Sequence, residues 1–591
     1  LKKQNGQIKE DATSLFKRVA KTVAAIEPTY GTLNVESELS ELEFYNIMAT
    51  LEFLPNSPTL MNAGTGQGTY SACFVLPLED SMEGIMQAAT HAAMVQKFGG
   101  GTGFSLSKIR PRGDKIQTTH GIACGPIEVL KTLSRISSMI TQGGKRDGAN
   151  MAVMSIYHPD ILEFISCKST EGDIHNFNIS VGVDSHWMKC VESDISYNLI
   201  NPHTNQLAGK LNAREVFNKI IDGAWQNGEP GMIFLDRVNE DNHVMKEYGP
   251  MIATNPCGEQ PLLGNESCNL GSINLAKFFR NNDIQFGESG WEKQIDWERL
   301  EKVTRVATRF LDNIIDANEY ATSEIEEMTK ATRKIGLGVM GFADLLIQLR
   351  VSYNSALARE IGDKVMEAIK SWADVESLEL GVLRGTFPAW ENSSYNKVTE
   401  GYRNNCRLTV APTGTISMLA DCSSGIEPSF ALVWKKQNIL VNKYFEQDAK
   451  EYGFYSENLM DYLAEGGSLQ NRDEVPQWAK NVYITAPEIL PKDHILMQAA
   501  FQQHVDSGIS KTINFDNSAT IQDVEDSYKL AWRTGCKGVT VYRAGSRDKE
   551  VLVKGTTVTS EESKCCETPQ IIMQDGCQSC KTCGWSACLI A

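Results

Sequence analysis

The sequence predicts an α/β fold, on the evidence of its length, its two alternating hydrophobic periods and its lack of internal repeats. The chain has 591 residues, of which 41% are hydrophobic, and this is well beyond the length at which a single core stops growing. Helical and strand patterns alternate from about Glu41 to Arg547, as is typical of α/β domains. We therefore expect one large α/β body with smaller segments at its ends.

Two helices and four buried strands can be assigned from their patterns. One helix is expected at 300–315, where the apolar side chains keep to one face. Another begins at Pro126, a favoured first helical position, and is expected to run through Ile140 and stop at Gly143-Gly144. Short apolar runs that are typical of buried strands occur at 73–76, 406–410, 511–515 and 538–542.

The two ends of the chain differ from this body. We expect an N-terminal helical segment at 1–50, the α/β body at 51–547, a polar flexible linker at 548–576 and a cysteine-rich element at 577–591. Leu1 stands where an initiator methionine is expected, which leaves open that N-terminal sequence is missing.

Composition excludes several classes of protein. The net charge of −17 argues against a nucleic-acid partner, because backbone binding needs a basic stripe. No run of roughly eighteen uncharged apolar residues and no apolar signal core is present, so we expect no membrane association and a cytoplasmic location. The fifteen cysteines then favour reduced, catalytic or metal-binding thiols. Six lie in the last 27 residues: Cys565, Cys566, Cys577, Cys580, Cys583 and Cys588.

The segment 255–260 carries an amide, a thiol and a carboxylate at alternate positions, as Asn255, Cys257 and Glu259. In an extended loop, a period of two would point all three side chains to one side. The thiol could then serve as a radical or a nucleophile, the carboxylate as a base and the amide as an orienting group. The alternative is a buried cysteine in a Pro-Gly turn.

Two further segments have both a structural and a functional interpretation. Residues 411–417 follow an apolar strand and offer hydroxyls and backbone N–H groups to a phosphate, although Thr and Ser there also suit helix caps. Asp80 precedes an apolar helix with Glu83 three residues on, which is the pattern of a capping box.

The motif NPCGEQPL at 255–262 resembles the finger-loop signature of class II, adenosylcobalamin-dependent ribonucleotide reductases of the dimeric branch. The resemblance covers nearly the whole body in family order. Its other motifs are SPTLMNAG (57–64), SACF (71–74), GGGTGFSLSKIRPRGD (99–114), GGKRDGANM (143–151), KIGLGVMGFADLL (334–346), APTGTIS (411–417) and KTIN…AWRTGCKGVTVYRAGSR (511–547).

The resemblance implies a ten-stranded α/β barrel with the finger loop through its centre and a thiyl radical on Cys257. Because such a radical needs water excluded, we expect the site to lie deep in the barrel. Glu259 would take the proton of the substrate 3′-hydroxyl, and Asn255 would hold the ribose hydroxyls. Cys73 and Cys268 would supply two electrons as a dithiol, although each could equally be an ordinary strand cysteine.

The resemblance also implies nucleotide sites and a homodimer. The ribonucleotide substrate would place its phosphate on Ser57 and on the loop residues Thr413, Gly414, Thr415, Ile416 and Ser417. Asp80 would bind the ribose of an allosteric effector, a dNTP or ATP, at the dimer interface, and Arg110 its phosphates. The segment 143–150 would pass effector identity to the substrate base, although a solvated basic turn is the alternative there. Its expected contacts are Gln142, Lys145 and Arg146.

The radical source follows from what the sequence lacks. Class I enzymes use two adjacent tyrosines, but Thr540 and Val541 stand at the matching positions, and the sequence contains no adjacent tyrosine pair. A glycyl-radical motif is also missing. Adenosylcobalamin, a cobalt cofactor, is left. The DxHxxG cobalamin motif is not completed at 173–178, and the family is expected to lack it.

The end of the chain resembles the family's mobile redox tail. Cys583 and Cys588 would enter the barrel, reduce the Cys73–Cys268 disulfide and be recycled by a thioredoxin-like protein. Cys577 and Cys580 would form half of a zinc ribbon. The other half departs from the usual spacing, so zinc in the tail stays open.

The function implied is reduction of ribonucleotides, with diphosphates favoured by the likeness to the dimeric branch. Two alternatives are a class I-type catalytic subunit and a non-catalytic nucleotide-binding regulator. The set of Cys73, Asn255, Cys257, Glu259 and Cys268 speaks against the regulator.

Overall fold

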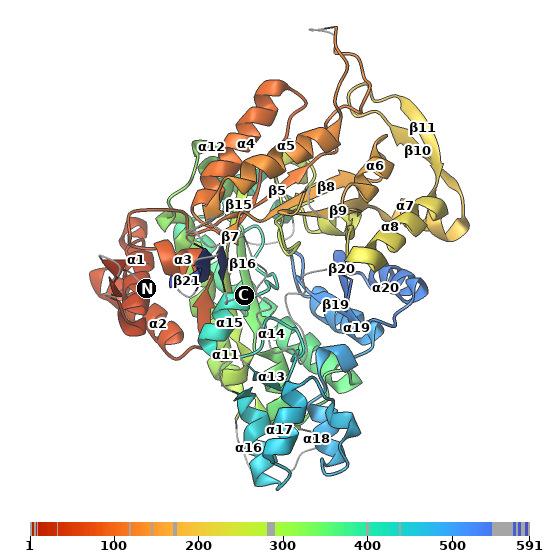
Figure 1. The fold of residues 1–591 in the computed structure, drawn as a ribbon. Coiled ribbons are helices and arrows are strands. Elements are labelled where there is room, and N and C mark those ends of the chain that lie inside the picture. The colour runs from red at the N-terminus through yellow and green to blue at the C-terminus, as the bar shows by residue number, and fades with distance from the viewer. Residues whose placement is uncertain are drawn as a thin grey trace. The chain divides into compact units, whose positions relative to one another are not determined.

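The computed structural model describes residues 3–4, 7–8, 10–31, 33–116, 120–142, 146–169, 174–280, 290–397, 401–435, 439–546, 571–574, 577–580 and 586–588. The chain divides into two compact units, 1–428 with 487–546, and 429–486 with 547–591. Figure 1 shows the fold. In the described residues, no helix combines the length and the apolar character that a membrane span needs.

A ten-stranded sheet organises the first unit (Figure 1). Its strands β4, β5, β8, β9 and β12 are parallel, as are β16 with β15 and β19 with β20, whereas β12–β20 and β15–β4 are antiparallel. Three runs of parallel strands therefore meet at two antiparallel joints. In path order the strands are β16 (Ile335–Met340), β15 (Glu266–Asn274), β4 (Cys73–Val75), β5 (Gly101–Ser105), β8 (Asn150–Ser155), β9 (Phe177–Val183), β12 (Gly231–Phe234), β20 (Gly538–Arg543) and β19 (Thr512–Phe515), with β3 (Phe53–Pro55) beside β15.

The segment 406–410 closes this sheet into a barrel. On one side the Leu337 backbone N–H donates to the Arg407 carbonyl at 2.8 Å, and on the other the Ser507 N–H donates to the Leu408 carbonyl at 3.0 Å. Parallel bridges join Leu337 to Leu408 and Val410 to Ile509, and the chain then continues into β19. The ten-stranded α/β barrel is thus confirmed.

The same segment corrects one sequence prediction, because 406–410 forms isolated bridges and no regular strand. The cause is a competing carboxylate. The backbone N–H groups of Arg407 and Leu408 both donate to Asp506, at 2.8 and 3.1 Å, so they are not available to a strand ladder. The other three predicted strands are confirmed as β4, β19 and β20.

Both predicted helices are present, with different ends. The helix expected at 300–315 is α11 (Trp297–Ala317), and the Asp296 side chain caps its N-terminus. The helix beginning at Pro126 is α5 (Pro126–Ser138) and stops before Ile140. The chain there forms β6 (Thr141–Gln142), which pairs with β7 (Arg146–Asp147), so hairpin pairing ends the helix earlier than the apolar pattern predicts.

Helices pack around the barrel and short hairpins extend from it. The remaining elements of the first unit are α1 (Ala12–Ala24), α2 (Asn34–Ala49), α3 (Ser57–Asn62), α4 (Met82–Lys97), α6 (Ile161–Ser166), α7 (Ser185–Ser193), α8 (Ala213–Asn227), α9 (Leu235–Glu240), α10 (Met245–Tyr248), α12 (Ser323–Thr332), α13 (Phe342–Gln348), α14 (Ala356–Arg384), α15 (Gly414–Ala420), α19 (Pro491–Gln502), α20 (Ile521–Arg533), β1 (Lys3–Gln4), β2 (Gln7–Ile8), β10 (Ser196–Ile200), β11 (Leu207–Asn212), β13 (Ala253–Thr254) and β14 (Pro261–Leu262).

The second unit contains helices and hairpins of its own. Its described elements are β17 (Val433–Lys435), β18 (Ile439–Val441), α16 (Lys443–Glu451), α17 (Glu457–Ala464), α18 (Gln477–Val482) and the three-stranded sheet of β21 (Ile571–Gln574), β22 (Cys577–Cys580) and β23 (Ser586–Cys588).

Two hydrophobic clusters lie on opposite faces of the barrel strands. Met151 and Val153 of β8 belong to the cluster that includes Ala253 and Leu262, on either side of the finger-loop turn. Ala152 and Met154 belong to the cluster shared with the surrounding helices. This is the period-two alternation of a strand that is buried on both faces. Cys73 and Cys268 both belong to the first cluster, so both side chains face the barrel interior.

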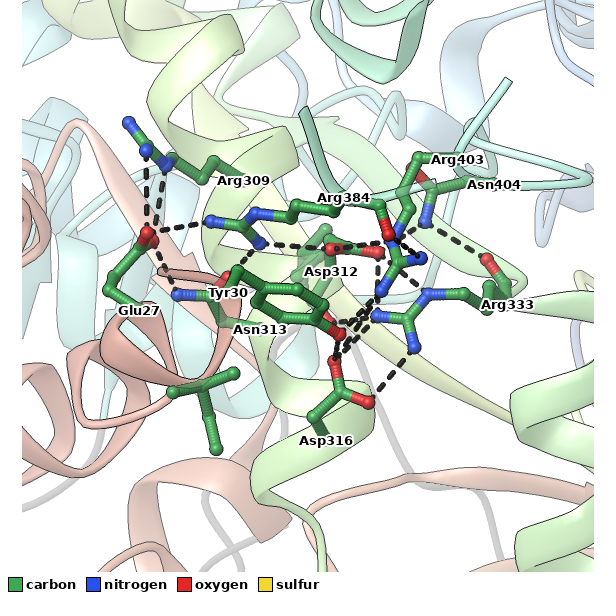
Figure 2. Close-up of polar contacts among 12 residues, drawn as sticks. Glu27, Tyr30, Arg309, Asp312, Asn313, Asp316, Arg333, Arg384, Arg403 and Asn404 are labelled. Atoms are coloured by element: carbon green, nitrogen blue, oxygen red, sulfur yellow. Dashed lines mark hydrogen bonds and ion pairs between the residues drawn. The ribbon is translucent and has the colours of Figure 1, made fainter. Parts of the chain in front are cut away.

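The N-terminal segment is held to the barrel by buried charges (Figure 2). Glu27, in the 3-10 turn Glu27–Tyr30, is fully buried and pairs with Arg384 at 2.7 Å and Arg309 at 3.1 Å. The guanidinium carbons of Arg384 and Arg403 lie 4.8 and 5.0 Å from the centre of the Tyr30 ring, a cation–π geometry. These contacts join the N-terminal segment to α11 and α14.

Asp312 of α11 is the acidic centre of the same network (Figure 2). It is fully buried and pairs with Arg333 at 2.8 Å, Arg384 at 3.1 Å and Arg403 at 3.4 Å. Burial alone would raise the pKa of Asp312, but the three arginines outweigh burial and hold this pKa at about 2. The carboxylate is therefore ionised at neutral pH.

Candidate active site

Cys73 and Cys268 lie directly opposite each other at the antiparallel joint of β4 and β15. Their residues are 2% and 0% exposed. Opposed residues in an antiparallel pair have Cα atoms about 4.5–5.5 Å apart, which lies within the range that a disulfide spans. The structure thus brings together two thiols that lie far apart in the sequence.

The segment 255–260 is a tight turn between β13 and β14. The Asn255 N–H donates to the Gln260 carbonyl at 3.0 Å, the Gly258 N–H donates to the Asn255 carbonyl at 3.1 Å, and Gly258 has a φ of +82°. The expectation of an extended loop with all three side chains on one side is therefore wrong. The turn instead separates Cys257 at its tip from Asn255 and Glu259 at its base.

Asn255 and Glu259, the two residues at the base of the turn, converge on one thiol. The Asn255 side-chain nitrogen lies 3.0 Å from the sulfur of Cys73, and this thiol donates to Oε1 of Glu259 at 3.7 Å. Asn255 and Glu259 are both buried. The other carboxylate oxygen of Glu259, Oε2, is buried without a hydrogen-bond partner in the described residues, so an acceptor stays available to a substrate hydroxyl.

Burial sets the protonation of these groups. It raises the pKa of the Cys73 thiol, and the nearby Glu259, Cys268 and Cys257 raise it further. Burial likewise raises the pKa of the Glu259 carboxyl, against the opposing effect of hydrogen bonds from Asn255. A carboxylate with a raised pKa is a stronger base than an exposed glutamate.

Cys257 departs from the expected depth. The other four residues of the set are buried, but Cys257 is exposed at the tip of the turn. The Pro256-Cys257 pair forms the corner of the hairpin, which holds the thiol away from the packed base. Exclusion of water at Cys257 would therefore need a ligand to cover it.

Glycines on the barrel strands allow the finger loop to lie against them. A Cβ added at Gly103 would lie 1.8 Å from the Thr254 carbonyl oxygen, and one at Gly508 would lie 2.6 Å from the Gly258 carbonyl oxygen. The Asn178 amide donates to the Pro256 carbonyl at 2.9 Å. The loop thus lies against β5 and β9 and against the segment at Gly508 that precedes β19.

The expected phosphate loop has an open backbone at the start of α15. Thr413 has a left-handed φ of +56° and makes no side-chain cap, so the alternative of a helix cap is wrong for this residue. Its hydroxyl accepts from the Gly425 N–H at 2.8 Å. A Cβ at Gly414 would meet no atom within 4 Å. Thr415 is exposed, whereas Ile416 and Ser417 are buried.

Ser57 lies near this loop. It is the first residue of α3, and α15 packs against β3, which ends at Pro55. The structure therefore brings the two predicted phosphate-binding segments to the same region of the barrel.

Asp80 and Arg110 form a partly buried ion pair at 2.8 Å, and His203 lies 3.6 Å from the same carboxylate. The alternative of a capping box at Asp80 is wrong, because Ser81 caps α4 by accepting from the Gly84 N–H at 3.0 Å. The Asp80 carboxylate is engaged by Arg110. Of the expected effector contacts, Lys145 lies outside the described residues, as do the side chains of Gln142 and Arg146.

The predicted redox tail is described only in part. Cys583 lies outside the described residues, and of Cys577, Cys580 and Cys588 only the backbone is described, with Cys577 opposite Cys588. Among the described side chains, no three His, Cys, Asp or Glu residues are grouped so that they could hold a metal ion. The side chains of the tail cysteines are not among them.

Sequence reasoning missed two charged residues near the dithiol, Glu266 and Lys334. Glu266 begins β15 two residues before Cys268, and Lys334 immediately precedes β16. Both are buried. The available signal was a charged residue at the start of β15 and another directly before β16, two strands that carry no other charge.

Comparison with known proteins is consistent with this geometry. A model of the ribonucleotide reductase barrel domain matches residues 71–542, and one of the ribonucleotide reductase all-alpha domain matches residues 1–68. The vitamin B12-dependent ribonucleoside-diphosphate reductase of Thermoplasma acidophilum is 47% identical over 525 residues, which cover 88% of this chain and 67% of that protein. The enzyme of the same name from Mycobacterium tuberculosis (strain CDC 1551 / Oshkosh) is 41% identical over 558 residues, 93% of this chain and 78% of that protein.

A solved structure agrees at the level of fold. The Actinobacillus ureae class Id ribonucleotide reductase alpha subunit superposes with a TM-score of 0.74 at 23% identity, over 91% of this chain and 95% of that chain. The barrel-domain match spans most of the chain, and the two named relatives are similar over nearly all of it. The chain therefore belongs to the ribonucleotide reductase family.

Proposed function

We propose that this chain is an adenosylcobalamin-dependent ribonucleoside-diphosphate reductase. The observation that carries the proposal is the convergence of Asn255 and Glu259 on the thiol of Cys73, directly opposite Cys268. The relatives that are 47% and 41% identical are named vitamin B12-dependent ribonucleoside-diphosphate reductases, which supports both the cofactor and the diphosphate substrate.

Cys257 and Glu259 begin the reaction. The Cys257 thiyl radical removes hydrogen from the 3′ carbon of the ribose, and the sulfur becomes a thiol. Glu259 accepts the 3′-hydroxyl proton, a role that fits its raised pKa and the unpartnered Oε2 atom. Asn255, held at the base of the loop, orients the ribose hydroxyls. Loss of the 2′-hydroxyl as water then becomes favourable.

Cys73 and Cys268 complete the reduction. They supply two electrons and two hydrogens as their sulfurs form a disulfide, and the products are a deoxyribonucleotide and water. Cys257 returns its hydrogen to the 3′ carbon, so the thiyl radical is regenerated. The cross-strand arrangement of the two thiols allows the disulfide to form without movement of the barrel.

Adenosylcobalamin, when bound, supplies the initial radical through homolysis of its cobalt–carbon bond. The exposed tip of the finger loop fits this role, because Cys257 can be reached by a group outside the packed base. Thr540 and Val541 of β20 cannot relay a radical as two tyrosines would. This argues against a class I-type subunit.

The remaining assignments follow the family pattern. The substrate diphosphate would bind at Ser57 and the 413–417 loop, and a dNTP or ATP effector at Asp80 and Arg110 in a homodimer. Cys583 and Cys588 would carry electrons from a thioredoxin-like reductant to the barrel, and this chemistry requires a reducing compartment such as the cytoplasm. Zinc bound by the tail cysteines would be structural.

Turnover of each ribonucleoside diphosphate with and without adenosylcobalamin tests the proposal. A small dithiol as reductant removes any dependence on the tail. We expect deoxyribonucleotide product only when the cofactor is present. Product formation at the same rate without it, or cofactor-dependent turnover of triphosphates only, would contradict the cofactor or the substrate assignment respectively.

A further inference from the structure

A buried ion pair lies beside the barrel dithiol. The Lys334 ammonium is 3.0 Å from Oε2 of Glu266, and the two side chains are 2% and 0% exposed. The mechanism proposed above does not use either residue. A buried pair of this kind contributes little net stability. Stability therefore does not explain why two charges are buried beside Cys268.

Strand register places this pair next to Cys268. Glu266 and Cys268 are two residues apart on β15 and share one face. Asn269 is paired with Ile335 in the parallel β15–β16 ladder, and Cys268 and Lys334 each stand one residue before that pair. The Cys268 sulfur accordingly lies 3.9 Å from the Lys334 carbonyl oxygen.

The pair also holds the root of the finger loop. Lys334 donates to the carbonyl of Pro261 at 3.2 Å, and Glu266 accepts from the N–H of Leu263 at 2.8 Å. Thr332 donates to the other Glu266 oxygen at 2.6 Å. The charge of Lys334 is therefore fixed relative to both β15 and the loop.

The two thiols of the dithiol consequently have opposite electrostatic surroundings. Cys73 faces the Glu259 carboxylate, and after burial this carboxylate is the main factor that raises the pKa of the Cys73 thiol. Burial also raises the pKa of Cys268, but Lys334 opposes this rise and does so more strongly than Glu266 adds to it. Cys73 thus faces a carboxylate at 3.7 Å, whereas Cys268 has a fixed ammonium beside it, which favours negative charge on Cys268 during exchange.

We propose that Lys334 is a positioning residue that sets the direction of thiol–disulfide exchange at the Cys73–Cys268 pair, so that an incoming thiolate bonds to Cys73 and Cys268 departs. This inference rests on the proposed function, in which the two cysteines are the redox dithiol. The better-stabilised thiolate is the better leaving group in such an exchange.

The exchange balances in two steps. A thiolate attacks the Cys73 sulfur, a new sulfur–sulfur bond forms to Cys73, and the Cys73–Cys268 bond breaks with its electron pair on Cys268, beside the Lys334 ammonium. A second thiolate then attacks the incoming sulfur and releases Cys73. Two thiols are oxidised to a disulfide while the barrel disulfide is reduced to two thiols.

The test maps the first step in the full chain carrying Cys583→Ser and Cys588→Ser, so that the proposed shuttle pair cannot compete. Diamide forms the Cys73–Cys268 disulfide, limiting 2-mercaptoethanol attacks it, and acid quenching followed by peptide mass spectrometry locates the adduct. We expect the adduct on Cys73 over Cys268 by about tenfold or more. An adduct mainly on Cys268 in this parent chain overturns the proposal.

A charge-neutral pair isolates the role of Lys334. Lys334→Met with Glu266→Gln removes both charges without leaving a buried charge unpaired, and we expect the adduct ratio to approach one and exchange to slow by about tenfold. Lys334→Arg should keep the Cys73 preference. An unchanged ratio and rate in the neutral pair would refute the role of Lys334.

The matched control is Lys511→Met with Glu427→Gln, which neutralises another ion pair, at 2.6 Å, whose lysine is buried and whose glutamate is partly exposed. Its charges are not among the main influences on the pKa of Cys73 or Cys268, so the adduct ratio and rate should equal those of the parent. If Cys73 and Cys268 form no disulfide in the parent, the proposed function itself loses its dithiol. If the disulfide forms but the charge-neutral pair leaves the adduct ratio and rate unchanged, only the inference on Lys334 fails.

Discussion

The side-chain nitrogen of Asn255 lies 3.0 Å from the sulfur of Cys73, although 182 residues separate the two in the chain. Asn255 stands at the base of the finger loop and Cys73 on β4, at an antiparallel joint of the barrel. The contact joins the loop to the dithiol, and Glu259 reaches the same sulfur. The reaction at the Cys73 thiol should therefore depend on the charge state of Glu259.

Glu259 should control the acid side of the pH profile. Burial favours its protonated form and raises its pKa above the ordinary 4.5, and a base must be ionised to act. The value of kcat/KM should therefore rise with pH through a midpoint above 4.5. Glu259→Gln should lower kcat by about 10²–10⁴-fold and remove this acid limb.

Glu376→Gln is the matched control for this prediction, because Glu376 is also a buried glutamate with a raised pKa, caused by burial. It lies on α14 and pairs with Arg305 of α11 at 2.9 Å, and neither residue belongs to the finger loop. Its pH profile should match the parent. An acid limb that survives in Glu259→Gln would contradict the assignment of the base.

Asp312 should make the stability of the N-terminal attachment sensitive to acid. Burial opposes its ionisation, but Arg333, Arg403 and Arg384 outweigh burial and lower its pKa from 3.8 to about 2. A carboxyl with a depressed pKa contributes stability that is complete above the unfolded value and is lost as pH falls through the folded value. The free energy of unfolding should therefore decrease between about pH 4 and pH 2.

Asp312→Asn should remove this pH dependence and cost about 3–5 kcal/mol at neutral pH, since it leaves buried arginines without their carboxylate. Denaturant unfolding of both chains across this pH range measures the effect. Asp421→Asn, at an exposed position after α15, is the control. Parallel stability curves for Asp312→Asn and the parent would show that the network is not the source of the acid sensitivity.

The sequence predicted the barrel and named candidate catalytic residues, but it did not predict how these residues are arranged. Cys73 and Cys268 face the interior because of their places on β4 and β15. The sequence left an extended loop and a Pro-Gly turn as alternatives at 255–260, and hydrogen bonds between Asn255 and Gln260 favour the turn. The exposure of Cys257 is a consequence of that turn.

Long-range electrostatics account for the other differences. The strand expected at 406–410 is replaced by bridges because Asp506, about a hundred residues later, takes its N–H groups. Asp80 is not the cap of α4, because Arg110 engages its carboxylate. Neither partner can be identified from the local pattern around the residue itself. The ion pair of Lys334 and Glu266 was missed for the same reason.

Arg110 should carry the response to allosteric effectors. If a dNTP binds at the Asp80–Arg110 pair, Arg110→Ala removes a phosphate contact while leaving basal turnover at Cys257 intact. A coupling of about 1–3 kcal/mol corresponds to a change of roughly 5- to 150-fold in substrate preference, and most of it should vanish in the variant. Competition among the four ribonucleotides, with each effector in turn, gives the product ratios.

Arg112→Ala is the matched control, because Arg112 is an exposed arginine two residues away that pairs with Glu163 at 3.2 Å. Its effector response should equal that of the parent. Identical product ratios under every effector in the parent chain would rule out allosteric control at this site.

Cys583 and Cys588 should matter only to delivery of electrons. With thioredoxin as reductant, Cys583→Ser or Cys588→Ser should allow about one turnover per barrel dithiol and then stall, because the barrel disulfide is no longer reached. With a small dithiol, turnover should continue. Single-turnover and steady-state product yields measure this, and unchanged multiple turnover with thioredoxin alone would refute the shuttle.

The central claim is that hydrogen abstraction occurs at Cys257, and the turnover of Cys257→Ala tests it most directly. The measurement is deoxyribonucleotide formation with adenosylcobalamin and a small dithiol, beside Cys124→Ala, which removes another exposed cysteine. Only the hydrogen-abstracting sulfur is lost in Cys257→Ala, so its product should fall to the level of the parent without cofactor, while Cys124→Ala retains full turnover. Appreciable cofactor-dependent turnover by folded Cys257→Ala would contradict the account.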